Sequence, residues 1–157
     1  MEIRADNPMS PHAAALLAEH VADVTRHAPR ESCHAMPAAA LSEAGVSFWT
    51  VWDGQTLVGC GALKELDARH GEIKSMRTVA SHRRRGAGAA MLEHVLAVAR
   101  ARGYERLSLE TGAQEAFVPA RSLYARFGFE RCGPFGGYRE DANSVFMTRG
   151  VDGEAVG

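Results

Sequence analysis

The chain has 157 residues, of which 46% are hydrophobic and 24% are charged, and its formal net charge is −1. These values fit a soluble globular protein with a real core, and they exclude a basic field that would draw it onto nucleic acid. Three widely spaced cysteines without a CxxC pair argue against a disulfide framework, and no apolar run is long enough for a membrane span. We expect a cytoplasmic protein with one domain over residues 1–150 and a frayed tail over residues 151–157.

The N-terminal part predicts a short strand followed by a helix. Residues 1–5 alternate weakly between apolar and polar side chains, and Ser10 and Pro11 are typical of a helix N-cap and of the first helical position. The helix is expected to end near His27, where the apolar spacing of three and four residues stops. The residues expected to face the core are Ala14, Leu17, Val21 and Val24.

Three antiparallel strands are expected next. The pair Asp53-Gly54 is a strong hairpin signal between the first two of them. The expected elements of this part are a loop at 28–37, a short helix at 38–44, strands at 46–52 and 56–66, a turn at 68–71 and a strand at 72–78.

The second half predicts a helical crossover and a final pair of strands. Its expected elements are a helix at 87–102 stopped by Gly103, a strand at 104–110, a helix at 119–126 ended by Gly128, and strands at 129–133 and 144–148. A crossover helix joins parallel strands, so the strands at 72–78 and 104–110 are expected to pair in parallel. The fold class is therefore a mixed α/β sheet of about seven mostly antiparallel strands, with a parallel central pair and flanking helices.

The stretch Arg83-Arg84-Arg85-Gly86-Ala87-Gly88 lies between the fourth strand and the crossover helix. Glycine lets the backbone approach a ligand, and a helix start offers unpaired N–H groups and the positive end of its dipole. The stretch is not a P-loop, which needs GxxxxGK[ST], and it lacks the third glycine of GxGxxG, whose position holds Met91. We expect a loop that binds a polyphosphate, with a solvated basic run as the alternative.

This loop resembles the [QR]-x-x-G-x-[GA] motif of the GNAT superfamily of acetyl-CoA-dependent N-acetyltransferases. A second motif, Ala120-Arg121-Ser122-Leu123-Tyr124 before Gly128-Phe129, is similar to the Ala-x-x-Leu-Tyr helix of that family. The resemblance covers roughly residues 46–148, and stretches such as Gly-Glu-Ile-Lys-Ser-Met-Arg and Cys-Gly-Pro-Phe are similar to the small bacterial YsnE-like subgroup. It implies a GNAT-like fold and an acyltransferase that uses acetyl-CoA as cosubstrate.

The resemblance also implies which residues hold coenzyme A, mostly through the main chain. In the family the loop amides wrap the pyrophosphate, and the preceding strand pairs with the pantetheine arm. The matching positions are Arg83, Arg84, Arg85, Gly86, Ala87, Gly88 and Ala89 in the loop, and Met76, Arg77 and Thr78 on the strand. Thr78 stands where the family usually has valine, which matters little for a main-chain contact. Phe117 stands where many members have asparagine, so that contact is not carried over.

Two carboxylates are candidates for the base that deprotonates an acceptor amine. Glu72 is the first choice, because it precedes Thr78 by the spacing at which some GNAT members carry a catalytic glutamate. A pairing of Glu72 with Lys74 or Arg69 is the alternative. Glu110 is the rival base: it ends the fifth strand on the face opposite to the apolar positions, where the parallel strands must splay.

The remaining roles concern the thioester and the acceptor pocket. A main-chain N–H, of Met76 or Arg77, is expected to polarise the thioester carbonyl, depending on a bulge that the sequence does not locate. Tyr124 corresponds to the residue that often protonates the departing thiolate, with packing against the sheet as the alternative. Phe135 and Tyr138, on a glycine-rich loop, are expected to line the acceptor pocket together with Glu72.

The sequence thus favours direct acetyl transfer to a primary amine of a small molecule. Acetylation of a protein N-terminus or lysine and a non-catalytic acyl-CoA sensor are the alternatives. A nucleic-acid binder is disfavoured by the net charge and by the lack of aromatic residues among the arginines. No metal is expected, because the seven histidines do not pair with cysteine or carboxylate at a metal-ligand spacing. No membrane partner is expected, and a homodimer stays open.

Overall fold

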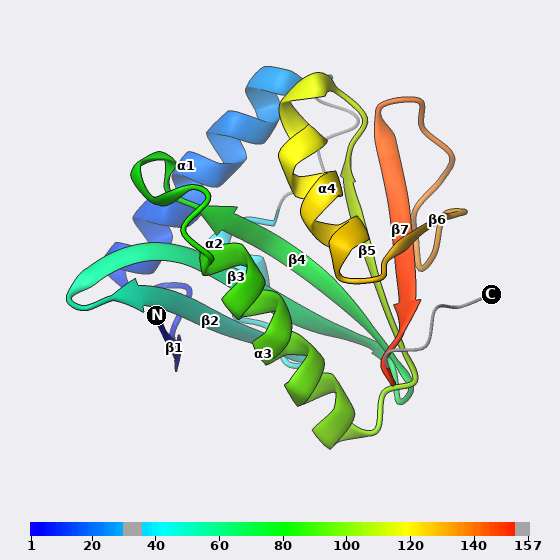
Figure 1. Cartoon of the computed structure of the whole chain (residues 1–157), viewed down its shortest axis with the longest axis horizontal. Coiled ribbons are helices and arrows are strands. Elements are labelled where there is room, and N and C mark those ends of the chain that lie inside the picture. Colours follow the sequence, from blue (N-terminus) through cyan, green and yellow to red (C-terminus); the bar gives the residue numbers. More distant parts are fainter. Residues whose placement is uncertain (30–35, 153–157) are drawn as a thin grey trace.

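The computed structural model describes residues 1–29 and 36–152 (Figure 1). Within this part of the chain one mixed sheet has seven strands in the order β1-β2-β3-β4-β5-β7-β6. The strands are β1 (Glu2–Ala5), β2 (Val46–Asp53), β3 (Thr56–Asp67), β4 (His70–Thr78), β5 (Arg106–Gly112), β6 (Glu130–Cys132) and β7 (Ser144–Gly150). The α-helices are α1 (Pro11–His27), α2 (Ala38–Leu41), α3 (Ala87–Arg102) and α4 (Val118–Arg126). The predicted mixed α/β sheet with one parallel pair, β4 with β5, is confirmed.

Some element boundaries differ from those predicted. The helix α2 ends at Leu41 instead of residue 44, and β5 begins at Arg106 and continues to Gly112. Ser10 precedes α1, but its hydroxyl donates to the carbonyl of Asn7 and does not cap the helix. Most of the predicted loop at 28–37, Cys33 included, lies outside the described residues.

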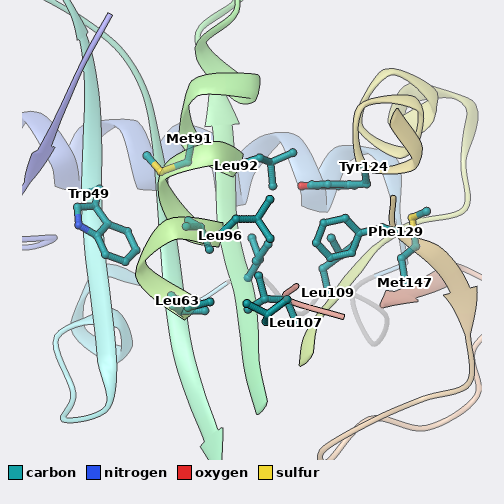
Figure 2. Close-up of a cluster of buried hydrophobic side chains, with 14 of the residues drawn as sticks. Trp49, Leu63, Met91, Leu92, Leu96, Leu107, Leu109, Tyr124, Phe129 and Met147 are labelled. Atoms are coloured by element: carbon teal, nitrogen blue, oxygen red, sulfur yellow. The ribbon is translucent and has the colours of Figure 1, made fainter. Parts of the chain in front are cut away.

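One face of the sheet carries the larger core (Figure 2). Because side chains alternate along a strand, Leu63, Ile73, Leu107 and Leu109 all point toward α3 and α4. Leu92 and Val95 of α3 meet them and are fully buried. This packing fixes the start of α3 relative to β4 and β5.

The opposite face carries a smaller core beneath α1 and α2. Its buried members are Ala13, Leu16, Leu17, Leu41, Phe48, Cys60 and Ala62. The prediction for α1 was right for Leu17 and wrong for Ala14, Val21 and Val24, which are only partly buried. For Val21 and Val24 the physical reason is that the C-terminal half of α1 borders a cleft instead of the core, and Val24 lines that cleft.

The parallel pairing between β4 and β5 is short. It joins His70–Ile73 with Arg106–Leu109 and then stops, although both strands continue. Figure 1 shows the two strands diverging toward the end of the sheet where α1 and α4 lie. This divergence was predicted for a GNAT-like sheet, and it creates the cleft described below.

Two further findings concern the ends and surfaces of the chain. Val151 is fully buried and its N–H donates to the carbonyl of Glu105, so the expectation of a frayed tail beginning at residue 151 is wrong there. Residues 153–157 lie outside the described part. Of the helices described, none combines the length and apolar composition needed to cross a bilayer.

Candidate active site

The divergence of β4 and β5 opens a cleft of about 1290 Å³. The C-terminal half of α1, both strands, the start of α3 and the helix α4 contribute to its lining. The predicted site residues that line it are Glu72, Met76, Arg77, Thr78, Arg83, Arg84, Gly86, Ala87, Gly88, Ala89, Glu110, Tyr124 and Tyr138. Two predicted residues, Arg85 and Phe135, are not part of the lining.

A β-bulge lies in β4 at the cleft. The ladder between β3 and β4 pairs Cys60 with Arg77 and Ala62 with Lys74, so two residues of β4 oppose the single residue Gly61. Ser75, the first bulged residue, has φ of +54°, a left-handed value that costs a non-glycine residue about 1–2 kcal/mol. The sequence could not locate this bulge, and the structure places it where the two parallel strands separate.

The side chain of Arg77 is committed to α1. Its guanidinium forms ion pairs with Asp23 at 2.8 Å and with Glu19 at 3.1 Å, and only 8% of the side chain is exposed. Arg77 therefore links α1, which forms one wall of the cleft, to β4.

The loop between β4 and α3 has the backbone of an anion site. Both Arg84 (φ +67°) and Gly86 (φ +90°) have left-handed conformations, and the first bond of this turn joins Ala90 N–H to the carbonyl of Gly86. The preceding N–H groups of α3 consequently have no acceptor within the helix. A Cβ atom on Gly86 would meet nothing within 4 Å, so the space beside the loop is open.

Glu72 is buried in a triad with Lys74 and Tyr138. The Tyr138 hydroxyl donates to Oε2 of Glu72, while Lys74 Nζ lies 3.2 Å from the same oxygen and 2.8 Å from the Tyr138 hydroxyl. Glu72 is only 3% exposed. The alternative in which Glu72 pairs with Lys74 is thus realised, and this carboxylate is already bound by two donors.

Glu110 lies on the same face of the sheet, one strand away from that triad. Burial raises the pKa of its carboxyl to about 7, against a weaker opposing effect of the Ser144 hydroxyl, which donates to Oε1 at 3.1 Å. The charge of Lys74 also lowers this pKa and the charge of Glu72 raises it. A carboxyl with a pKa near 7 is suited to accept a proton at neutral pH.

Tyr124 enters the cleft from α4. Its ring packs edge-on against Phe129, and Figure 2 shows the ring extending from α4 toward α3. Burial and the nearby charge of Glu110 both raise the pKa of its hydroxyl, which therefore stays protonated at neutral pH. Tyr124 thus packs in the core, as the packing alternative expected, and it also lines the cleft, so its predicted role as the acid for the thiolate stays a prediction.

An aromatic cluster lies behind Tyr138, which lines the cleft. Phe135 packs against Tyr138, Phe146 and His70, with ring centroids 5.1, 5.9 and 5.9 Å away. Phe135 thereby positions the Tyr138 ring and does not itself face the cleft.

Sequence reasoning missed His20, which also lines the cleft and whose pKa falls to about 4, mainly through burial. Its spacing of three residues from Leu17 on α1 was the available signal.

A second cluster, near the N-terminus, has the composition of a hydrolase triad but not its geometry. Both Asp6 (2.8 Å) and Ser10 (3.3 Å) contact the same nitrogen, Nε2, of His12. A proton relay needs one partner on each ring nitrogen, so this cluster cannot activate the serine. Nor do the described residues contain a group of three or more side chains that could hold a metal ion.

Comparisons with known proteins agree on one family. A sequence model of the acetyltransferase (GNAT) family matches residues 13–129. The chain is 52% identical over 149 residues to YsnE of Bacillus subtilis (strain 168), covering 95% of this chain and 99% of that protein. It is 44% identical over 146 residues to YedL of Escherichia coli (strain K12), covering 93% and 92%. Both relatives are described as uncharacterized N-acetyltransferases.

Solved structures of the same fold include proteins with coenzyme A. A Klebsiella pneumoniae protein assigned as an acyl-CoA N-acyltransferase has a TM-score of 0.78 at 28% identity, over 96% of this chain and 97% of that one. An aminoglycoside 6'-N-acetyltransferase complexed with coenzyme A has a TM-score of 0.72 at 12% identity, over 96% and 97%. At that identity the second likeness shows the fold alone.

Proposed function

Because this acyltransferase belongs to the acetyltransferase (GNAT) family, we propose that it moves an acetyl group from acetyl-CoA directly to a primary amine of a small molecule. The observation that carries the proposal is Glu110, a cleft carboxyl whose pKa is raised to about 7. It lies in the same cleft as Tyr124 and as the open backbone of the loop at 83–88. A base, an acid and an anion site in one cleft are what acetyl transfer requires.

Acetyl-CoA is the cosubstrate in this proposal. Its diphosphate would accept hydrogen bonds from the N–H groups of Ala87, Gly88 and Ala89, with Arg83 and Arg84 adding positive charge. Its pantetheine arm would run along the unpaired part of β4, at Met76 and Thr78. The size of the cleft and the open space at Gly86 support this assignment.

We assign the base to Glu110 in preference to Glu72. Hydrogen bonds to an ionised carboxylate weaken it as a base, and Glu72 already accepts from Tyr138 and Lys74. Glu110 accepts only from the Ser144 hydroxyl among the described hydrogen bonds. Glu110 would take one proton from the acceptor ammonium, which leaves the neutral amine that can attack.

The proton returned to sulfur would come from Tyr124. While Glu110 is ionised, its charge is one of two causes that keep the pKa of Tyr124 high. Once Glu110 has accepted the amine proton, that charge is gone and Tyr124 becomes the stronger acid. The C–S bond breaks as the C–N bond forms, and the hydroxyl proton of Tyr124 passes to the leaving sulfur. The acylated nitrogen then loses its second proton, which restores the Tyr124 hydroxyl, and Glu110 releases its proton to solvent.

The charge balance of the cleft favours an acceptor with a single amine. The negative charge of Glu72 is compensated by Lys74 at 3.2 Å, so Glu110 is the carboxylate that remains to attract a cation. A polyamine would bring further charges next to Lys74, whose side chain is 10% exposed and lines the same cleft. We therefore favour small monoamines over polyamines and over lysine-rich protein segments.

The test is incubation with acetyl-CoA and a panel of amines, with release of free thiol as the signal. The panel should include monoamines, polyamines, aminoglycosides and peptides with a free N-terminus or lysine. Acetylation of a small monoamine, identified by mass spectrometry, is the expected result. Turnover only with peptides would replace the small acceptor by a protein. Tight binding of acetyl-CoA without turnover for any acceptor would favour the non-catalytic sensor.

A further inference from the structure

Cys60 of β3 contacts the bulge of β4 from the neighbouring strand. Its thiol donates to the main-chain carbonyl of Ser75, with 3.2 Å between sulfur and oxygen. Cys60 is 1% exposed, and burial raises the pKa of the thiol to about 12. The sulfur therefore keeps its proton at neutral pH, as a hydrogen-bond donor must.

A second main-chain group acts on the same sulfur. The charge of Arg77, and after it the backbone N–H of Arg77, oppose part of the rise in the pKa of the Cys60 thiol. The ladder pairs Cys60 with Arg77 and Ala62 with Lys74, so Ser75 and Met76 have no paired residue of their own on β3. Of these two, Ser75 is bound to Cys60 through its carbonyl, and Met76 lines the cleft, where its N–H is the bulge amide available for a thioester oxygen.

The bulge needs such a contact because its conformation is unfavourable. Ser75 has φ of +54°, and its buried hydroxyl has no hydrogen-bond partner among the described residues. A backbone conformation of this kind persists only where the surroundings determine it.

The residues on both sides of Cys60 fit the bulge closely. A Cβ atom on Gly59 would lie 2.6 Å from the Arg77 carbonyl oxygen, and one on Gly61 would lie 2.8 Å from Met91 and 2.9 Å from Met76. A side chain at Gly59 would have to move the β4 backbone, and one at Gly61 would have to displace the side chains of Met76 and Met91. Cys60 is therefore the residue of this segment whose side chain can reach the bulge.

We propose that Cys60 is a positioning residue for acetyl transfer, whose thiol fixes the β4 bulge so that the Met76 N–H points at the thioester carbonyl. The inference depends on the proposed acetyltransferase function for its kinetic consequence. Its structural part, a hydrogen bond that sets the direction of the Met76 N–H, does not depend on turnover.

The test compares Cys60→Val, which nearly keeps the volume and removes the donor, with Cys60→Ser, which keeps a donor. Cys132→Val is the matched control, because Cys132 is a free cysteine on another strand and does not line the cleft. For Cys60→Val we expect kcat to fall about tenfold, equal to about 1.4 kcal/mol, while KM for acetyl-CoA changes less than about twofold. Cys60→Ser should restore kcat to within about threefold of wild type.

The Met76 amide resonance in each full-length variant provides the readout that needs no turnover. In Cys60→Val this resonance should shift and its hydrogen exchange should accelerate, while the Cys132→Val spectrum stays as in wild type near the bulge. An unchanged Met76 amide in Cys60→Val would overturn the inference, even if no amine is ever acetylated. Equal kcat loss in Cys60→Val and Cys60→Ser would also overturn it, because packing alone would then explain the effect.

Discussion

The two halves of the cleft are built from different parts of the chain. The proposed cofactor half, formed by residues 75–78 of β4 and the loop at 83–88, offers mainly main-chain groups. The proposed acceptor half, formed by Glu72, Lys74, Glu110 and Tyr138, offers side chains. Three of these, Glu72, Lys74 and Tyr138, are joined by hydrogen bonds between residues up to 66 positions apart. The first half tolerates changes of side chain and depends on backbone shape. The second half depends on which side chains are present and how they share protons.

This difference predicts two classes of variant. Changes in the acceptor half should alter rate and pH dependence while acetyl-CoA still binds. Changes in the cofactor half should alter acetyl-CoA binding, and they should do so through backbone conformation more than through charge.

The largest effect is expected for Glu110→Gln, which removes the proposed base. At pH 7 we expect kcat to fall about 100-fold or more, the range found when a general base is lost. Wild-type kcat should rise with pH through about 7, because the carboxyl must be ionised to accept a proton. In the variant that rise should disappear and be replaced by one near the pKa of the acceptor amine. The measurement is a pH–rate profile of both proteins.

Glu72→Gln is the matched control for that experiment, since Glu72 is a carboxylate in the same cleft. We expect it to lower the rate while keeping the inflection near pH 7. If Glu72→Gln removes the inflection and Glu110→Gln keeps it, the base is Glu72 and our assignment is wrong.

The second effect concerns Gly86→Val in the cofactor half. A β-branched residue at φ of +90° is strained and would force the loop to a new shape. We expect the affinity for coenzyme A, measured by calorimetry, to fall about 10- to 100-fold while the fold is kept. Gly54→Val is the control, because Gly54 also has a positive φ (+61°) and open space around it, but it lies in a hairpin outside the cleft. Equal loss in both variants would contradict the loop assignment.

A third effect is on stability, and it again concerns Glu110. Its pKa is 4.5 in a free side chain and about 7 in the folded protein, so between these pH values only the folded state keeps the proton. Stability should therefore fall as pH rises from about 4.5 to 7 and remain lower above it. Glu110→Gln should be more stable than wild type by about 1–3 kcal/mol at pH 8 and by little at pH 4. Urea unfolding at both pH values measures this difference, and a variant that is less stable at pH 8 would argue against a raised pKa.

The smallest effect is expected for Arg83→Ala. Arg83 is exposed and lines the cleft, so its charge should contribute little. In Arg83→Ala we expect the affinity for acetyl-CoA to fall only about two- to threefold at low salt. The contribution should vanish at high ionic strength. Arg85→Ala is the control, because Arg85 carries the same charge and does not line the cleft. If Arg83→Ala still loses affinity for acetyl-CoA at high salt, Arg83 makes a specific contact with the ligand instead of a screened electrostatic attraction.

The same contrast explains how far the sequence could predict the structure. The spacing of Gly86 and Gly88 between a strand and a helix indicated a loop with an unusual backbone shape, because backbone shape at a glycine is a local property. That this loop binds phosphate stays a prediction. The i, i+2 spacing of Glu72 and Lys74 on one strand face made their pairing foreseeable. The contact between Glu72 and Tyr138 was not foreseeable, because Tyr138 is on a loop, where no regular spacing of residues indicates which way a side chain points. The raised pKa of Glu110 likewise depends on burial by several elements.

One wrong prediction and one position that the sequence did not locate have separate physical origins. The spacing of apolar residues on α1 is continuous in sequence, yet the core ends after Leu17 because the rest of that helix faces the cleft. The position of the β4 bulge depends on how β3 lies against it, and Gly59-Cys60-Gly61 gives no sign of that register in sequence alone.

The short parallel pairing of β4 and β5 also bears on aggregation. Where the strands separate, each presents an inner sheet edge, and exposed edges normally invite pairing with strands of other molecules. Residues of α1 and α4 line the space between these edges. A foreign strand with side chains on both faces would collide with these helices, whereas a slender linear molecule with its own amide groups would fit. The helices that flank the opening in the sheet would therefore admit only thin ligands, and they would disfavour strand pairing between two copies of the protein.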